Sequence, residues 1–185
     1  MAYRQTSKDT FEWKSIDHII DNVKYAVLLL NHSMDHLSGH KSATFDKIWR
    51  KAERRVAVDG GSKYLRCPQE HPFPDILNGD FDSVQTERLE YFRRNGTKIM
   101  ETPDQDYTDF QKAVKIVLHL NKRAVYENNN VDTNGTGSSN GGAVAAAAGE
   151  DRQRQACGAI IAIWSSLGRI DQVLSNINTL YSNDY

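Results

Sequence analysis

The chain has 185 residues, of which 39% are hydrophobic and 25% are charged, a composition typical of one folded domain. Its formal net charge of −1 gives no electrostatic reason to expect a nucleic-acid or anionic-membrane partner. Residues 1–17 lack the apolar core of a signal peptide, and the longest aliphatic run, Ala26 to Leu30, is too short to span a bilayer. The cysteines, Cys67 and Cys157, lack metal-ligand spacing, so we expect a reduced, cytoplasmic protein with plain thiols.

The first third of the chain alternates short apolar runs with helical patterns. Residues 1–22 are polar with scattered apolar positions, and we expect a loose lead-in there. Residues 24–31 form a continuous apolar run, typical of a strand buried on both faces. Apolar residues at helical spacing predict a helix over about 43–53, followed by a short strand at 55–58. One or two helical turns are expected over residues 62–66.

The alternation continues after an irregular, proline-rich connection at residues 67–74. We expect strands over 75–78 and 97–100, separated by a helix over about 83–96. Strands that alternate with helices in this way indicate an α/β fold with a parallel sheet.

The last third contains a break in the pattern. A helix capped by Thr108 or Asp109 is expected to run to about residue 120. From about 127 to 155 the chain is rich in Asn, Gly, Ser and Ala, so we expect a disordered low-complexity surface loop. A buried strand is expected over 158–164, and then a helix over 170–180. That helix is expected to turn these apolar residues inward: Ile170, Val173, Leu174 and Ile177.

Aspartates gather in three clusters, each of which follows an expected strand. The clusters are Asp59, then Asp80 with Asp82, then Asp104 with Asp106 and Asp109. The carboxyl ends of parallel strands converge on one crevice, where open α/β sheets bind ligands. Several carboxylates in one place repel one another unless a cation lies among them, and such oxygen ligands suit Mg²⁺ shared with substrate phosphates. The clusters therefore predict a Mg²⁺-nucleotide site.

Two of the clusters also have plainer interpretations. Asp80 and Asp82 point the same way in an extended segment and could hold one metal, or they could cap the following helix. Some sugar-nucleotide transferases use such a pair as well. The Asp59-Gly60-Gly61 turn either brings backbone N–H groups to an anion or simply joins a strand to a helix.

The remaining polar residues are equally open to two interpretations. Asp106 and Asp109 either share a site-facing helix surface or serve as acids at a helix N-terminus. Arg169 and Asp171 offer a phosphate-binding cation and a further carboxylate, or else a surface ion pair. There is no Gly-x-x-x-x-Gly-Lys-Ser/Thr loop, and no Gly-x-Gly-x-x-Gly follows a strand, which argues against P-loop kinases and dinucleotide-dependent enzymes.

Taken together and in this order, five segments resemble thiamin pyrophosphokinases. They are LLLN (28–31), VAVDGGSKYL (56–65), PDILNGDFDSV (74–84), TPDQDYTDFQKAV (102–114) and LGRIDQVLSNINTL (167–180). The resemblance implies a three-layer α/β domain with a parallel, Rossmann-like sheet over residues 23–185. It also implies transfer of a pyrophosphoryl group from ATP to the hydroxyethyl oxygen of thiamin, which gives thiamin diphosphate and AMP.

The resemblance implies roles for individual residues. Asp80, Asp82 and Asp106 would hold Mg²⁺ and, with Asp109, form the catalytic set, in which Asp109 takes the proton from the attacking hydroxyl. Further contacts to the co-substrate ATP or to thiamin would come from Asp59, Gly60, Gly61, Gln105, Thr108, Arg169 and Asp171. Acids, a metal and an arginine suit phosphoryl-type transfer, which depends mostly on positioning and charge neutralisation.

The chain departs from the family pattern in two places. Members carry a C-terminal β-sandwich domain that forms much of the homodimer contact and contributes to the thiamin pocket. We expect that domain to be absent here, and the surface that would meet it to expose apolar area. The insert at about 127–155 falls in a connection, so we expect the core to be intact.

Two competing hypotheses come from other classes. Without the β-sandwich, the chain could be a non-catalytic nucleotide-binding or dimer-modulating module. On the Asp-x-Asp pair alone, it could be a nucleotide-sugar transferase.

Overall fold

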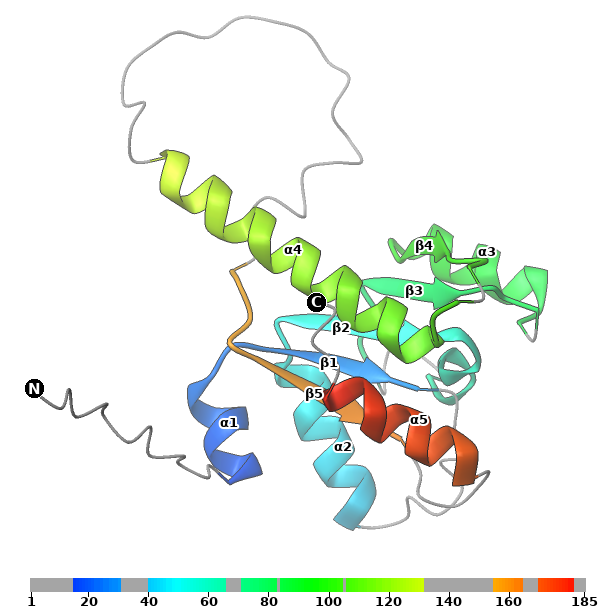
Figure 1. Cartoon of the computed structure of the whole chain (residues 1–185), viewed down its shortest axis with the longest axis horizontal. Coiled ribbons are helices and arrows are strands. Elements are labelled where there is room, and N and C mark those ends of the chain that lie inside the picture. Colours follow the sequence, from blue (N-terminus) through cyan, green and yellow to red (C-terminus); the bar gives the residue numbers. More distant parts are fainter. Residues whose placement is uncertain are drawn as a thin grey trace, which may run out of the picture.

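A parallel sheet forms the centre of the molecule (Figure 1). The computed structural model describes residues 15–30, 40–65, 71–82, 84–104, 106–131, 155–164 and 170–181. Within these residues the sheet has five strands in the order β4-β3-β2-β1-β5. They are β1 Tyr25–Leu29, β2 Arg54–Val58, β3 Ile76–Gly79, β4 Lys98–Glu101 and β5 Ala159–Ile163. Every pairing between them is parallel, which confirms the expected sheet.

Helices cover both faces of this sheet. They are α1 Ile16–Asn22, α2 His40–Lys51, α3 Thr86–Arg94, α4 Asp109–Val131 and α5 Ile170–Tyr181, with a 3₁₀ helix, η1, at Asp59–Tyr64. Ile20, Trp49 and Phe92 bring α1, α2 and α3 into the core on one face. Phe110 and Val117 bring α4 into the core on the other, where α5 lies beside it. The three-layer α/β fold is therefore confirmed.

The position of β1, an interior strand between β2 and β5, explains why its sequence is apolar throughout. Tyr25, Val27 and Leu29 belong to one core, whereas Ala26 and Leu28 belong to the other. Successive side chains of a strand point to opposite faces, so a strand covered on both sides must be apolar at every position. All five residues are buried.

The long helix α4 begins as expected and ends later. The Thr108 hydroxyl accepts the Gln111 N–H (3.1 Å) while the Gln111 side chain accepts the Thr108 N–H (2.9 Å), a reciprocal capping box. The helix then runs to Val131, past the expected end near residue 120 and into the stretch expected to be a disordered loop. Ala124 is buried in this extension, whereas Val125 and Tyr126 are exposed. The rest of that stretch, to residue 154, lies outside the described residues.

Two smaller differences concern the N-terminal part. Residues 16–22, expected within a loose lead-in, form α1, and the hydroxyl of Ser15 accepts the His18 N–H at its start (3.2 Å). The preceding residues, 1–14, lie outside the described part of the chain. Helix α3 begins at Thr86, three positions later than its expected start.

The orientation of α5 contradicts the expectation from its apolar stripe. Of the four residues expected to face inward, Ile170, Leu174 and Ile177 are exposed and Val173 is half-buried, while Asn176 and Thr179 are buried instead. The Thr179 hydroxyl donates to the carbonyl of Ser175 one turn earlier (3.0 Å), so its inward position leaves its own donor satisfied. The apolar stripe of α5 therefore faces outward.

Asn121 of α4 fixes the point where the chain re-enters the sheet. Its amide donates to the Cys157 carbonyl and accepts the Cys157 N–H, both at 2.9 Å. The next residue, Gly158, donates its N–H to the Lys24 carbonyl (2.8 Å). Within the described ranges, no helix has both the length and the apolarity needed to cross a bilayer.

Candidate active site

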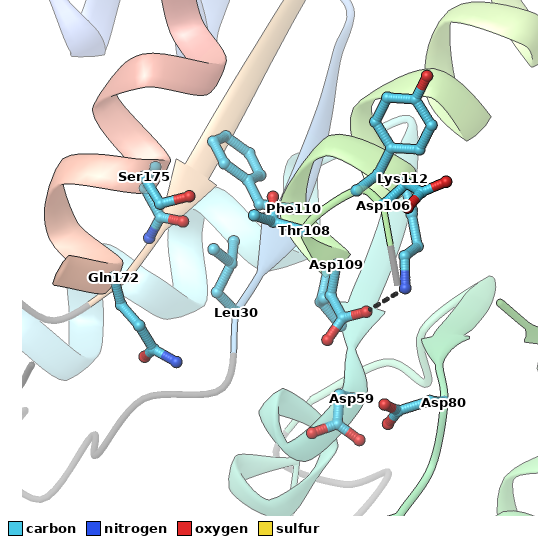
Figure 2. A pocket seen from close by; sticks show the side chains of 13 residues that line it. Leu30, Asp59, Asp80, Asp106, Thr108, Asp109, Phe110, Lys112, Gln172 and Ser175 are labelled. Carbon is cyan, nitrogen blue, oxygen red and sulfur yellow. Dashed lines mark hydrogen bonds and ion pairs between the residues drawn. The ribbon is translucent and has the colours of Figure 1, made fainter. Parts of the chain in front are cut away.

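A cleft of about 440 Å³ opens at the carboxyl edge of the sheet. Its floor comes from the ends of β1, β2 and β3, one wall comes from the start of α4, and the other comes from α5 (Figure 2). The lining residues are Leu30, Val58, Asp59, Asp80, Asp106, Tyr107, Thr108, Asp109, Phe110, Lys112, Gln172, Ser175 and Asn176. A volume of this order is within the usual range for a small-molecule site, roughly 300–1,000 Å³.

The position of the cleft follows from the strand order. The chain adds β2, β3 and β4 on one side of β1 and then returns through α4 to add β5 on the other side. The direction of strand addition therefore reverses between β1 and β5, and ligands of open α/β sheets bind at such a reversal. The cleft extends from this point, beside Leu30, to the acids that follow β2 and β3.

Three carboxylates gather at the acidic end of the cleft. One oxygen each of Asp59, Asp80 and Asp82 can be chosen so that all lie within 4.8 Å of one another. Asp59 is buried, Asp80 is half-buried and Asp82 is exposed. The neighbouring Asp80 raises the pKa of Asp82 above its ordinary value, with smaller contributions from desolvation, Asp59 and Asp109. This mutual repulsion and the all-oxygen donor set fit a hard divalent cation such as Mg²⁺.

Unusual backbone conformations bring Asp59 to this group. Asp59 itself has φ 44°, in the left-handed region that residues other than glycine rarely adopt. Opposite it, Gly79 has φ 157°, and a Cβ built on Gly79 would lie 3.0 Å from the Cβ of Asp59. The absence of a side chain at Gly79 lets the end of β3 lie against Asp59, directly before Asp80.

Asp109 reaches the cleft from the first turn of α4. Its Oδ1 pairs with the Lys112 ammonium at 3.0 Å, and Figure 2 shows its carboxylate above Asp59 and Asp80. Asp109 also contributes to the raised pKa of Asp82, so the fourth acid lies within electrostatic reach of the other three. A helix N-terminus favours negative charge, which suits both Asp109 and an anionic ligand at this place.

The structure brings together only some of the residues expected at the site. Asp59, Asp80, Asp106, Thr108 and Asp109 line the cleft, and Asp82 completes the group of three acids. Asp106 is exposed and is not a member of that group. The others expected there are placed differently: Gly60 and Gly61 are buried within η1, Asp171 is exposed on the first turn of α5, and Gln105 and Arg169 lie outside the described residues.

Eight cleft residues were not expected at the site from the sequence, and four of them are polar or charged residues on helices. Helix α5 contributes Gln172, Ser175 and Asn176. They were missed because the apolar stripe of α5 led to the wrong prediction of which side of this helix faces the sheet. Lys112 comes from α4, where its spacing of three residues from Asp109 was the available signal.

An acidic cleft at the carboxyl edge of a parallel α/β sheet is the arrangement found in many nucleotide-binding α/β domains. A family model described as "Thiamin pyrophosphokinase, catalytic domain" matches residues 45–185. The chain belongs to this family. The nucleotide-sugar transferase alternative is left without support.

Curated relatives agree with the family assignment. The chain is 30% identical over 110 residues to thiamine pyrophosphokinase 2 of Arabidopsis thaliana, covering 52% of this chain and 39% of that protein. It is 33% identical over 87 residues to thiamin pyrophosphokinase 1 of Caenorhabditis elegans, covering 46% of this chain and 34% of that protein. The match therefore spans well under half the length of each relative.

Two solved structures share the fold. The yeast thiamin pyrophosphokinase structure superposes with a TM-score of 0.60 at 23% identity, covering 90% of this chain and 57% of that one. The Candida albicans structure superposes with a TM-score of 0.58 at 23% identity, covering 89% and 55%.

Proposed function

We propose that this chain provides the catalytic domain for transfer of a pyrophosphoryl group from ATP to thiamin. The observation that carries the proposal is the convergence of Asp59, Asp80 and Asp82 with Asp109 in one cleft. Membership of the thiamin pyrophosphokinase family and the similarity to named thiamine pyrophosphokinases support this choice of reaction and substrates. In this reaction the hydroxyethyl oxygen of thiamin attacks the β-phosphorus of ATP, and the bond from that phosphorus to the α–β bridging oxygen breaks, releasing AMP.

The acids divide into two roles in this proposal. Asp59, Asp80 and Asp82 hold Mg²⁺, which when bound neutralises charge on the transferring phosphates. The sequence predicted that Asp106 also binds the metal. Asp106 lines the cleft but is not a member of this group of acids, so the present proposal gives it no metal role. Asp109 accepts the proton of the attacking hydroxyl, since its side chain is 35% exposed and reaches the same cleft from the wall formed by α4.

The cleft has two chemically different ends, which suggests how substrates lie in it. Carboxylates dominate over β2 and β3, whereas Gln172, Ser175 and Asn176 supply uncharged hydrogen-bonding groups beside β1. The metal and phosphates suit the acidic end, and an uncharged part of a substrate suits the amide-lined end. Homodimer assembly and a cytoplasmic location are separate proposals that rest on the family resemblance alone.

The deciding experiment measures AMP and thiamin diphosphate formed by the 185-residue chain with Mg²⁺, ATP and thiamin. We expect product from the wild-type chain and a loss of at least about 100-fold in Asp80→Asn, because charge neutralisation at the phosphates is removed. Glu87→Gln is the matched control, because it removes one exposed carboxylate on α3 and should leave the rate unchanged. Circular dichroism shows that each variant is folded. Unchanged turnover in folded Asp80→Asn would overturn the metal assignment.

A second candidate function is a non-catalytic nucleotide-binding or dimer-modulating module. The match covers 39% of the Arabidopsis relative and 57% of the yeast structure, so the activity of those whole proteins comes to this chain only as a proposal. Such a module would bind ATP in a Mg²⁺-dependent way without forming AMP. It would also change the activity of a full-length thiamin pyrophosphokinase when the two are mixed. Absence of both effects would remove this candidate.

A further inference from the structure

Lys112 is the one cation among the described residues that line the cleft. Its side chain is only 9% exposed. The ammonium donates to Asp109 Oδ1 at 3.0 Å and to the Thr102 carbonyl at 2.8 Å. An ammonium taken out of water is costly unless it is paired and hydrogen-bonded, and these two contacts meet that need within the protein.

These contacts connect three elements of the site. Asp109 begins α4, and Thr102 directly follows β4. The Thr102 N–H in turn donates to the carbonyl of Gly79 at 2.8 Å, and Gly79 is the last residue of β3, immediately before Asp80. A short chain of hydrogen bonds therefore runs from the Asp109 carboxylate, through Lys112 and Thr102, to the strand end that carries Asp80.

Asp109 and Lys112 differ in exposure, which indicates that the two paired side chains have different roles. Asp109 is 35% exposed and Lys112 only 9%, so the carboxylate faces the cleft more openly than the ammonium does. The same pairing offsets one negative charge where three further acids converge. Without Lys112, the Asp109 carboxylate would be repelled by those acids and would lose the contact that fixes its rotamer.

We propose that Lys112 is a positioning residue: it holds the Asp109 carboxylate in the orientation required for proton acceptance and ties that orientation to the strand end bearing Asp80. This inference rests on the proposed function, because it assigns Lys112 a role through Asp109. It predicts that removing the ammonium changes the rate of the chemical step more than the binding of ATP.

Kinetics of four proteins test this role: wild type, Lys112→Met, Asp109→Asn and the double variant. Lys112→Met keeps much of the aliphatic stem and should lower kcat about 10- to 100-fold, with KM for ATP changed less than about threefold. In the Asp109→Asn background the same substitution should lower kcat less than about threefold, because its target is already gone. Lys122→Met removes an exposed lysine of the same helix and should leave both constants unchanged. Independent, multiplicative losses, or a raised KM at unchanged kcat, would overturn the proposal.

A second readout does not depend on turnover or on the folding of Lys112→Met. Proton–nitrogen NMR of lysine ammonium groups should show a slowly exchanging Lys112 signal that shifts or disappears in Asp109→Asn, while the Lys122 signal is unaffected. If the wild-type chain forms no product yet shows this response, the proposed function fails for this chain and the positioning contact stands. A Lys112 signal that does not respond to Asp109→Asn refutes the positioning role whatever the activity.

Discussion

A single added methyl group at Gly61 tests how closely η1, which begins with Asp59, packs against the interior strand β1. A Cβ on Gly61 would lie 2.2 Å from the Leu29 carbonyl oxygen and within 3.1 Å of the carbonyl carbons of Leu29 and Leu30. All three are backbone atoms at the end of β1, so none can swing aside as a side chain would. Gly61→Ala must therefore shift η1 away from the sheet, together with Asp59.

The expected magnitude follows from this contact. Overpacking that moves backbone costs typically 1–3 kcal/mol, and a clash with three backbone atoms places Gly61→Ala at the upper end, about 3 kcal/mol. That is a large share of a domain stability of about 5–15 kcal/mol. For a domain of this size it corresponds to a fall in Tm of about 6–12 °C.

Gly96→Ala is the matched control for this substitution. Gly96 has φ 86° and no heavy atom within 4 Å of a built Cβ, so its substitution carries only the left-handed backbone penalty of about 1 kcal/mol. Urea unfolding followed by far-UV circular dichroism, together with thermal melts, measures both variants. If Gly61→Ala costs no more than Gly96→Ala, the close approach of η1 to β1 is not as described.

Three further predictions test other parts of the structure. The pKa of Asp82 is raised above its ordinary value of 3.8, so ionisation of this carboxyl destabilises the folded state as pH rises above that value. Asp82→Asn should therefore melt at a higher temperature than wild type at pH 7 without divalent cations, and its melting temperature should rise less on addition of Mg²⁺. Equal melting curves would contradict this prediction. Leu174→Gln on the outer face of α5 should change the free energy of unfolding by less than about 0.5 kcal/mol, whereas Leu28→Ala in β1 should cost about 2–5 kcal/mol. Similar costs in urea titrations would refute the orientation of α5. Thr108→Ala should cost about 1 kcal/mol by removing the cap of α4, and hydrogen exchange should show faster opening of the first helical turn; unchanged protection there would argue against the cap.

The layers and the strand order along the chain could be predicted because most strands contain a short apolar run that ends at a turn or an acidic residue. The prediction for residues 24–31 brackets β1, Tyr25–Leu29, since a strand covered on both faces has no polar position to obscure it. The orientation of α5 could not be predicted in the same way. Helical periodicity identifies an apolar stripe but not the side on which the sheet lies, and here Asn176 and Thr179 pack inward.

The site was partly predictable for a similar reason. Asp59, Asp80 and Asp82 follow neighbouring strands, so a parallel sheet brings them together. The participation of Lys112 depends on a buried ammonium that bonds both within α4 and to the end of β4, a contact between elements that spacing along the chain does not reveal.

The paired hydrogen bonds between Asn121 and Cys157 bear on how this chain tolerates changes in length. They hold the residues on both sides of the long connection between α4 and β5. Loop-closure entropy grows only with the logarithm of length, so doubling the connection would cost about 0.6 kcal/mol. We therefore expect insertions or deletions in this connection, such as an inserted reporter peptide, to leave the register of β5 and the geometry of the adjacent cleft unchanged.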